Sequence, residues 1–242
     1  MLNNQVAVVT GAGRGIGRAI ALGYAKAGAA VVCSARTAAQ IDETVGLIKE
    51  AGGEAMAMVA DVADYSSMYR LFERCSSEYG GLDLVVANAG VSPQNALVAN
   101  SDPALWKQTI DVNLTGSFYT ARAAVPHLQK RGGGKILFVG SGMGHRSSPT
   151  RSAYAASKAG LWMFTRVLAQ ELCDQNICVN ELVPGPVLTE FVAGRVDALR
   201  SSTGNVEWFK QPEDLIPLVL FIASQPNNGP TGQSFSLARR DL

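Results

Sequence analysis

The feature that most restricts the fold of this chain is the alternation of short apolar runs with longer helical patterns. Most of the runs are almost entirely apolar, as expected of strands that are buried on both faces of a parallel sheet. Because parallel strands need a crossover connection, usually a helix, the order strand–helix–strand predicts right-handed βαβ units. The sequence therefore predicts an α/β protein rather than an all-helical or all-strand one.

These units repeat along the whole chain and predict a three-layer, doubly wound Rossmann fold with a mostly parallel, seven-stranded sheet. We expect a single domain over residues 1–242, with an irregular segment at about 186–211 that covers the substrate. The expected strands are 6–10, 30–35, 54–60, 82–87, 135–141, 177–183 and 233–237. The expected helices are 15–28, 38–51, 65–79, 102–131, 153–174 and 212–224.

Composition excludes several classes of function. The chain has 242 residues, of which 21 are basic and 20 acidic, so no basic excess favours nucleic acid. No apolar run approaches the roughly 20 residues of a membrane helix, and the first residues have no signal-peptide pattern. The four cysteines and two histidines are scattered, so we expect no metal site. A cytoplasmic enzyme with reduced thiols fits these features.

A glycine-rich loop, TGAGRGIG at residues 10–17, follows the first expected strand. Its glycines would let the backbone turn sharply and approach a pyrophosphate at the positive end of the next helix. The spacing is TGxxxGxG rather than GxGxxG, because Ile16 occupies the place of the last glycine. The loop favours a dinucleotide site, and a tight strand–helix turn is the alternative.

When the glycine-rich loop is taken together with further motifs, the whole chain resembles a short-chain dehydrogenase/reductase of ordinary length. Within that family it is similar to 3-oxoacyl-[acyl-carrier-protein] reductases. The resemblance implies a nicotinamide dinucleotide cofactor, a carbonyl or alcohol substrate, and a homotetramer or homodimer. It rests on TGAGRGIG (10–17), DV (61–62), NAG (88–90), Asn113 in DVNLTG, Ser141, YAASK (154–158) and PGPVLT (184–189).

The end of the second strand predicts NADP(H) rather than NAD(H). An NAD-binding fold usually has an acidic residue there that binds the ribose 2′-hydroxyl. Here Ala35 occupies that place, Arg36 follows it, and Arg14 lies in the glycine loop. Two guanidiniums would favour a 2′-phosphate by charge and by geometry. The alternative is that both arginines are solvated surface charges.

The resemblance also indicates which residues contact the cofactor. Asp61 and Val62 would flank the adenine, and Thr189 would bind a phosphate or the amide, or cap a lid helix. The full predicted set is Gly11, Gly13, Arg14, Gly15, Ile16, Gly17, Arg36, Asp61, Val62, Asn88, Ala89, Gly90, Tyr154, Lys158, Pro184, Gly185, Val187 and Thr189.

Tyr154 and Lys158 are four residues apart, so on a helix they share one face. A phenol with an ordinary pKa of about 10 is a poor base, but a nearby ammonium favours the phenolate. Tyr154 could then exchange a proton with a carbonyl or alcohol oxygen. A surface pair on a helix is the alternative.

Two more residues are candidates for the same chemistry. Ser141 precedes Tyr154 by thirteen residues, the family's spacing for a serine that polarises the substrate oxygen. By resemblance, Asn113 loosens its helix and holds a water that links Lys158 to solvent. An ordinary serine at a strand end, and an N-cap or polar core asparagine, are the alternatives. His145 would line the pocket wall.

The preferred function is NADPH-dependent reduction of a ketone, such as a 3-oxoacyl thioester. The alternatives are a dehydrogenase of a sugar, polyol or steroid-like alcohol, and a non-catalytic NADP(H)-binding sensor. We expect a small-molecule carbonyl or alcohol substrate, and neither a nucleic acid nor a membrane as partner.

Overall fold

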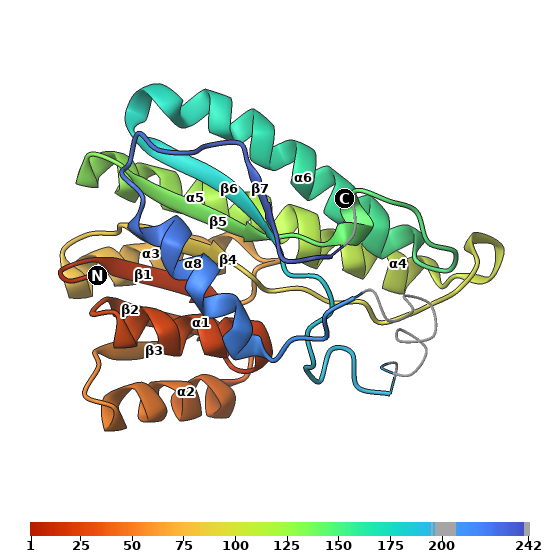
Figure 1. Cartoon of the computed structure of the whole chain (residues 1–242), viewed down its shortest axis with the longest axis horizontal. Helices are drawn as coiled ribbons and strands as arrows, with labels where there is room; N and C mark the ends of the chain where they lie inside the picture. Colours follow the sequence, from red (N-terminus) through yellow and green to blue (C-terminus); the bar gives the residue numbers. More distant parts are fainter. Residues whose placement is uncertain (195, 197–206, 240–242) are drawn as a thin grey trace.

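The structure is a computed structural model of the whole chain and describes residues 1–194, 196 and 207–239 (Figure 1). Within these residues, seven parallel strands form one sheet in the order β3-β2-β1-β4-β5-β6-β7. This confirms the predicted α/β Rossmann-type fold and the seven strands. The strands are β1 (Val6–Thr10), β2 (Ala30–Ala35), β3 (Ala55–Val59), β4 (Leu84–Ala87), β5 (Gly134–Val139), β6 (Ile177–Val183) and β7 (Ser234–Ser236).

The strand order reverses between β1 and β4. Ala7 of β1 lies opposite Val31 of β2 on one side and opposite Leu84 of β4 on the other. The chain therefore builds outwards from β1 in one direction and from β4 in the other. At such a switch point, the loops beyond the carboxyl ends of the strands diverge and leave a crevice that can hold a ligand.

Helices cover both faces of the sheet, and Figure 1 shows α1 and α8 side by side on one of them. The strands are apolar at successive positions because successive side chains face opposite sides of the sheet, and helices cover both. Val9 packs into the core beneath α1, α2 and α8. Its neighbour Val8 packs into the core beneath α3, α5 and α6. The helices are α1 (Gly15–Lys26), α2 (Ala38–Glu50), α3 (Tyr65–Tyr79), α4 (Pro103–Ile110), α5 (Gly116–Arg131), α6 (Ser152–Leu172) and α8 (Ile216–Ser224).

The expected single helix at 102–131 was wrong. The structure has α4, then the π-helical turn η2 (Asp111–Thr115), then α5. The helix expected at 212–224 likewise begins as a 3₁₀ turn, η6 (Pro212–Leu215), and Pro217 lies in the first turn of α8, where a missing N–H is tolerated.

The predicted lid at 186–211 lies partly outside the described residues, which omit 195 and 197–206. Among the described helices, none is long and apolar enough to cross a membrane. The described part of the chain also holds no group of three or more His, Cys, Asp or Glu residues placed to bind a metal ion.

Candidate active site

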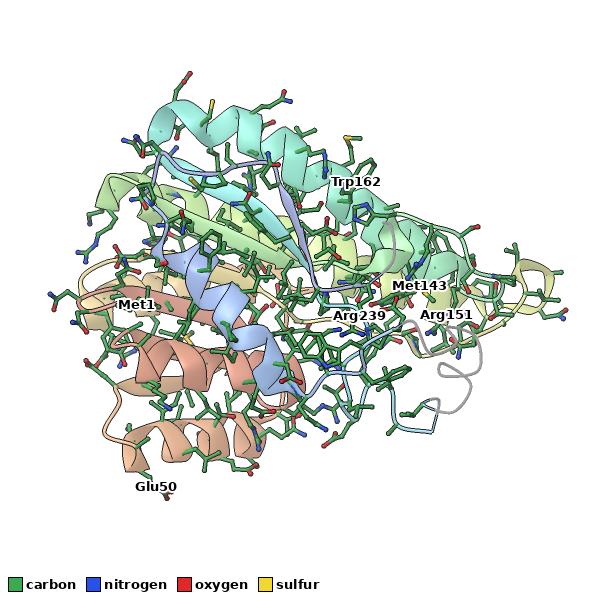
Figure 2. All side chains as sticks on the ribbon, in the orientation of Figure 1. Met1, Glu50, Met143, Arg151, Trp162 and Arg239 are labelled. Carbon is green, nitrogen blue, oxygen red and sulfur yellow. The ribbon has the colours of Figure 1, made fainter. Side chains whose placement is uncertain are left out.

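A cavity of about 380 Å³ lies beyond the carboxyl ends of the strands at the switch point. The glycine loop after β1 lines one part of it, and Tyr154 and Lys158 of α6 line another. Figure 2 labels two other lining residues, Met143 and Arg151, beyond the strand ends. The cavity thus brings the predicted nucleotide-binding loop and the predicted proton-transfer residues into one space.

The glycine loop has the close packing that a dinucleotide site needs. A Cβ atom added at Gly17 would lie 2.7 Å from the carbonyl carbon of Gly11, so only glycine lets α1 begin this close to the loop. The loop is tied to the end of β4, where Asn88 Nδ2 donates hydrogen bonds to Thr10 O at 3.0 Å and Gly11 O at 3.3 Å. The N-terminus of α1 therefore faces the cavity and fits a pyrophosphate.

The ends of β2 and β3 form the wall where the ribose and adenine would lie. Arg14, Arg36, Asp61 and Val62, which the sequence analysis expected to contact the cofactor, all line the cavity. Arg14 also forms an ion pair with Glu190, in which both side chains are mostly exposed. The sequence analysis did not foresee this carboxylate, which contacts a guanidinium predicted to bind a 2′-phosphate.

Tyr154 and Lys158 share one face of α6, and the Lys158 Nζ atom lies 5.9 Å from the centre of the Tyr154 ring. Lys158 is buried, and its Nζ donates a hydrogen bond to Val139 O at the end of β5 at 2.7 Å. Burial lowers the pKa of Lys158 from 10.5 to about 8, while the nearby Glu181 carboxylate acts in the opposite direction. The Lys158 amine is thus held beside the Tyr154 phenol, and desolvation disfavours its charged form.

Ser141 lies in the loop that follows β5, in extended backbone, rather than within the strand expected at 135–141. Its Oγ accepts a hydrogen bond from Met143 N at 3.2 Å, which fixes the direction of the side chain. Because the bond from Met143 uses an acceptor site, the hydroxyl can donate its own proton to an oxygen in the cavity.

Asn113 is fully buried in the π-helical turn η2 and does not line the cavity. Its Nδ2 donates to Val91 O and to Ser157 Oγ, both at 3.0 Å, and its Oδ1 accepts from Val91 N at 2.8 Å. Asn113 therefore joins the loop after β4 to helix α6, one residue from Lys158. This is the polar core role that the sequence left open as an alternative, and the break in the helix agrees with the resemblance.

All but one of the remaining predicted cofactor residues line the cavity, and their contact with a cofactor stays a prediction. Gly17 packs behind the loop and does not line the cavity. His145 does not line it either, because its ring turns to Glu181 of β6. The cavity-lining residues from the predicted set are Gly11, Gly13, Arg14, Gly15, Ile16, Arg36, Asp61, Val62, Asn88, Ala89, Gly90, Tyr154, Lys158, Pro184, Gly185, Val187 and Thr189.

Sequence reasoning missed two arginines that line the cavity, Arg146 and Arg151. The Arg151 guanidinium lies 5.8 Å from the centre of the Tyr154 ring, and its Nη1 donates to Ser92 Oγ at 3.1 Å. Neither arginine stands in a motif. The only signal in the sequence was their position between Ser141 and Tyr154.

Comparison with known proteins agrees with this geometry. Residues 5–199 match the family model described as short chain dehydrogenase. A short-chain type dehydrogenase/reductase from Picea abies is 37% identical, with 92% of this chain and 87% of the relative covered. A 3-oxoacyl-[acyl-carrier-protein] reductase from Thermotoga maritima is 32% identical, with 96% and 95% covered.

One solved structure also carries a nucleotide. It comes from Beutenbergia cavernae, is provisionally named an NAD(P)-dependent gluconate 5-dehydrogenase, and contains NADP at low occupancy. It is 34% identical to this chain and superposes on it with a TM-score of 0.91. The match covers 98% of this chain and 96% of the related chain.

Proposed function

This chain belongs to the short-chain dehydrogenase/reductase family, and on that premise we propose that it is an NADP(H)-dependent oxidoreductase acting on a ketone or secondary alcohol. The observation that carries the proposal is the placement of Tyr154, Lys158 and Ser141 around the cavity that the glycine loop also lines. The cofactor, when bound, supplies or accepts a hydride.

The side chains of this protein would handle the oxygen and the proton. The Ser141 hydroxyl would donate a hydrogen bond to the carbonyl oxygen and stabilise the charge that develops on it. Tyr154 would give its phenolic proton to that oxygen in reduction, and take one from the alcohol in oxidation. The Lys158 ammonium would favour the phenolate left on Tyr154, because opposite charges stabilise each other in a partly buried site.

Asn113 would not touch the reacting atoms but would act through the residues that it positions. It holds Val91 and Ser157 in fixed positions, and Ser157 Oγ in turn donates a hydrogen bond to Tyr154 O at 2.8 Å. The proposed role is to keep this end of α6 in register, so that a water can link Lys158 to solvent and restore the proton that Tyr154 loses.

The preference for NADP(H) follows from the wall beside the ribose. Ala35 carries no carboxylate that would repel a 2′-phosphate, and Arg36 and Arg14 both line this part of the cavity. Guanidiniums bind phosphate through charge and paired hydrogen bonds. The NADP in the related solved structure supports the same cofactor.

A 3-oxoacyl thioester is the preferred substrate. The segment after β6 brings the apolar residues Phe191 and Val192 to the cavity, and the Phe191 ring lies 5.9 Å from the Tyr154 ring. The relative from Thermotoga maritima is named for such a substrate. A sugar or polyol is the second candidate, favoured by the polar Arg146 and Arg151 and by the relative named for gluconate.

The test is a comparison of kcat/KM for NADPH and NADH with acetoacetyl thioester, followed by a screen of ketones and sugar-derived carbonyl compounds. We expect NADPH to be preferred at least tenfold, with the thioester among the better substrates. A preference for NADH would contradict the cofactor assignment, and turnover of no carbonyl or alcohol compound would favour a non-catalytic sensor.

We further propose a cytoplasmic homotetramer, or a homodimer, assembled through α5 and α6. Apolar side chains lie exposed on these two helices, with exposed fractions of 42% for Phe118, 49% for Met163 and 46% for Val167. Exposed apolar residues on neighbouring helices support the proposal that this face packs against a second copy. Light scattering should give a mass of four or two chains, and a monomer would contradict the proposal.

A further inference from the structure

The chain carries an acidic residue at an unusual place, inside β6. Glu181 follows Asn180 in the run ICVNELV, whose other five residues are apolar, and it is completely buried. A buried carboxylate is costly unless hydrogen-bond donors surround it. Two donors are present, because Ser234 Oγ of β7 donates to Oε2 at 2.5 Å and His145 Nε2 lies 3.1 Å from the same oxygen. The carboxylate thus joins three separate segments of the chain.

His145 connects Glu181 to the loop that carries Ser141. This loop is a tight turn, η3 (Gly142–Gly144), in which Gly144 N donates to Ser141 O at 2.9 Å and His145 N donates to Gly142 O at 3.2 Å. The His145 ring is also held by the Trp162 ring of α6, at 5.2 Å between centres. The contact with Glu181 therefore anchors the far end of the turn that begins at Ser141.

Glu181 also touches the near end of the same turn. A Cβ atom added at Gly140 would lie 2.6 Å from both Cγ and Cδ of Glu181, so the backbone just before Ser141 rests directly on this side chain. Gly140 N donates to Leu182 O at 2.8 Å, which fixes the backbone to the same strand. Both ends of the Ser141 turn thus contact the same buried carboxylate.

We propose that Glu181 and His145 are positioning residues, which hold the Ser141 turn so that the serine hydroxyl points at the substrate oxygen. This deepens the proposed function and rests on it for the role of Ser141. Neither residue touches the reacting atoms, because neither lines the cavity. For His145 to donate to the Glu181 side chain, its Nε2 must carry the ring proton.

The test uses a matched pair of variants. His145→Gln can place an amide N–H near the position of Nε2 and keep the bond to Glu181, whereas His145→Asn is too short to reach it. His127→Asn is the control, because His127 is the other histidine of the chain and faces Glu73 across α3 and α5, at 3.5 Å. Glu181→Gln keeps an acceptor for His145 and should match His145→Gln in amide exchange, although it also removes the carboxylate that raises the pKa of Lys158.

The first measurement is amide hydrogen exchange of the cofactor-free protein, which needs no activity. We expect the Gly144 and His145 amides to exchange at least tenfold faster in His145→Asn. In His145→Gln, Glu181→Gln and His127→Asn they should stay within threefold of the wild-type rates. Unchanged protection in His145→Asn would overturn the proposal.

The second measurement is a double-mutant cycle on kcat with Ser141→Ala. His145→Asn should lower kcat about tenfold, with the Kd for NADPH within twofold of wild type, and should lower it no further once the Ser141 hydroxyl is absent. Equal losses with and without that hydroxyl would overturn the proposal. If the wild-type protein reduced no carbonyl compound, the proposed function would fail, and the exchange rates would still decide whether the turn is held.

Discussion

Lys158 Nζ lies 5.9 Å from the centre of the Tyr154 ring, one helical turn away on α6. The ammonium is buried, and only part of the desolvation is offset by Glu181. Burial therefore destabilises the charged form of Lys158. The same charge lies beside the Tyr154 phenol and favours its ionised form.

The first prediction concerns the pH dependence of stability. Because burial lowers the pKa of Lys158 from 10.5 to about 8, the folded protein binds fewer protons than the unfolded chain between these two pH values. Stability then rises with pH across this window. The free energy of unfolding of the cofactor-free wild type, relative to that of Lys158→Met, should increase by up to about 3 kcal/mol from pH 7.5 to pH 10.5. Urea unfolding at several pH values measures this difference, and a constant difference would contradict it.

The second prediction exchanges the cofactor preference. The double variant Ala35→Asp/Arg36→Ala places a carboxylate where a ribose 2′-hydroxyl would lie and removes one guanidinium from the 2′-phosphate. Charge-assisted hydrogen bonds of this kind are worth about 1.5–3 kcal/mol, or roughly 10- to 100-fold in affinity. The Kd for NADPH should rise by that factor and the Kd for NADH should fall. Fluorescence titration measures both, and an unchanged ratio would show that Arg36 is only a surface charge.

The third prediction concerns the Arg14–Glu190 ion pair. If Arg14 binds the 2′-phosphate, the Glu190 carboxylate competes for the same guanidinium. Glu190→Gln should tighten NADPH about two- to fivefold at low salt and leave NADH unchanged, because exposed pairs are worth no more than about 1 kcal/mol. The effect should disappear near 1 M salt. Glu78→Gln, which breaks the exposed pair with Arg74 on α3, is the control and should change neither affinity.

The fourth prediction concerns the buried asparagine. Asn113→Ala removes three hydrogen bonds and leaves both polar backbone atoms of Val91 without their side-chain partner. We expect the free energy of unfolding to fall by about 3 kcal/mol, because unsatisfied buried groups are costly. Asn100→Ala, at an exposed asparagine before α4, should change it by less than about 0.5 kcal/mol. Equal effects of the two substitutions in urea unfolding would contradict the role of Asn113.

Much of the fold could be predicted because the strands are buried on both faces. The runs around Val8 and Val9, and around Val85, are apolar at consecutive positions, as a short strand must be when helices cover both sides of its sheet. The helical pattern did not place the break near Asn113, which the family resemblance alone indicated, since a π-helical turn depends on the contacts of that side chain with Val91 and Ser157 rather than on helix propensity.

The parts of the site that could be predicted are those in motifs with fixed spacing. Tyr154 and Lys158 lie on one helix, so their shared face follows from the helical period. The Arg14–Glu190 pair joins residues 176 positions apart, and no local pattern indicates it. Glu181 did leave a signal, a charge within a buried strand, which pointed to an unusual site without showing that His145 would be its partner.

The most direct test of the central claim is the turnover of Tyr154→Phe, measured together with its affinity for NADPH. The phenolic oxygen is removed, while the ring that packs against Phe191 remains. We predict that kcat falls by roughly 10³-fold, the scale of a lost proton-transfer group, and that the Kd for NADPH stays within threefold of the wild-type value. A variant that still turned over within tenfold of wild type would contradict the claim that Tyr154 exchanges the proton.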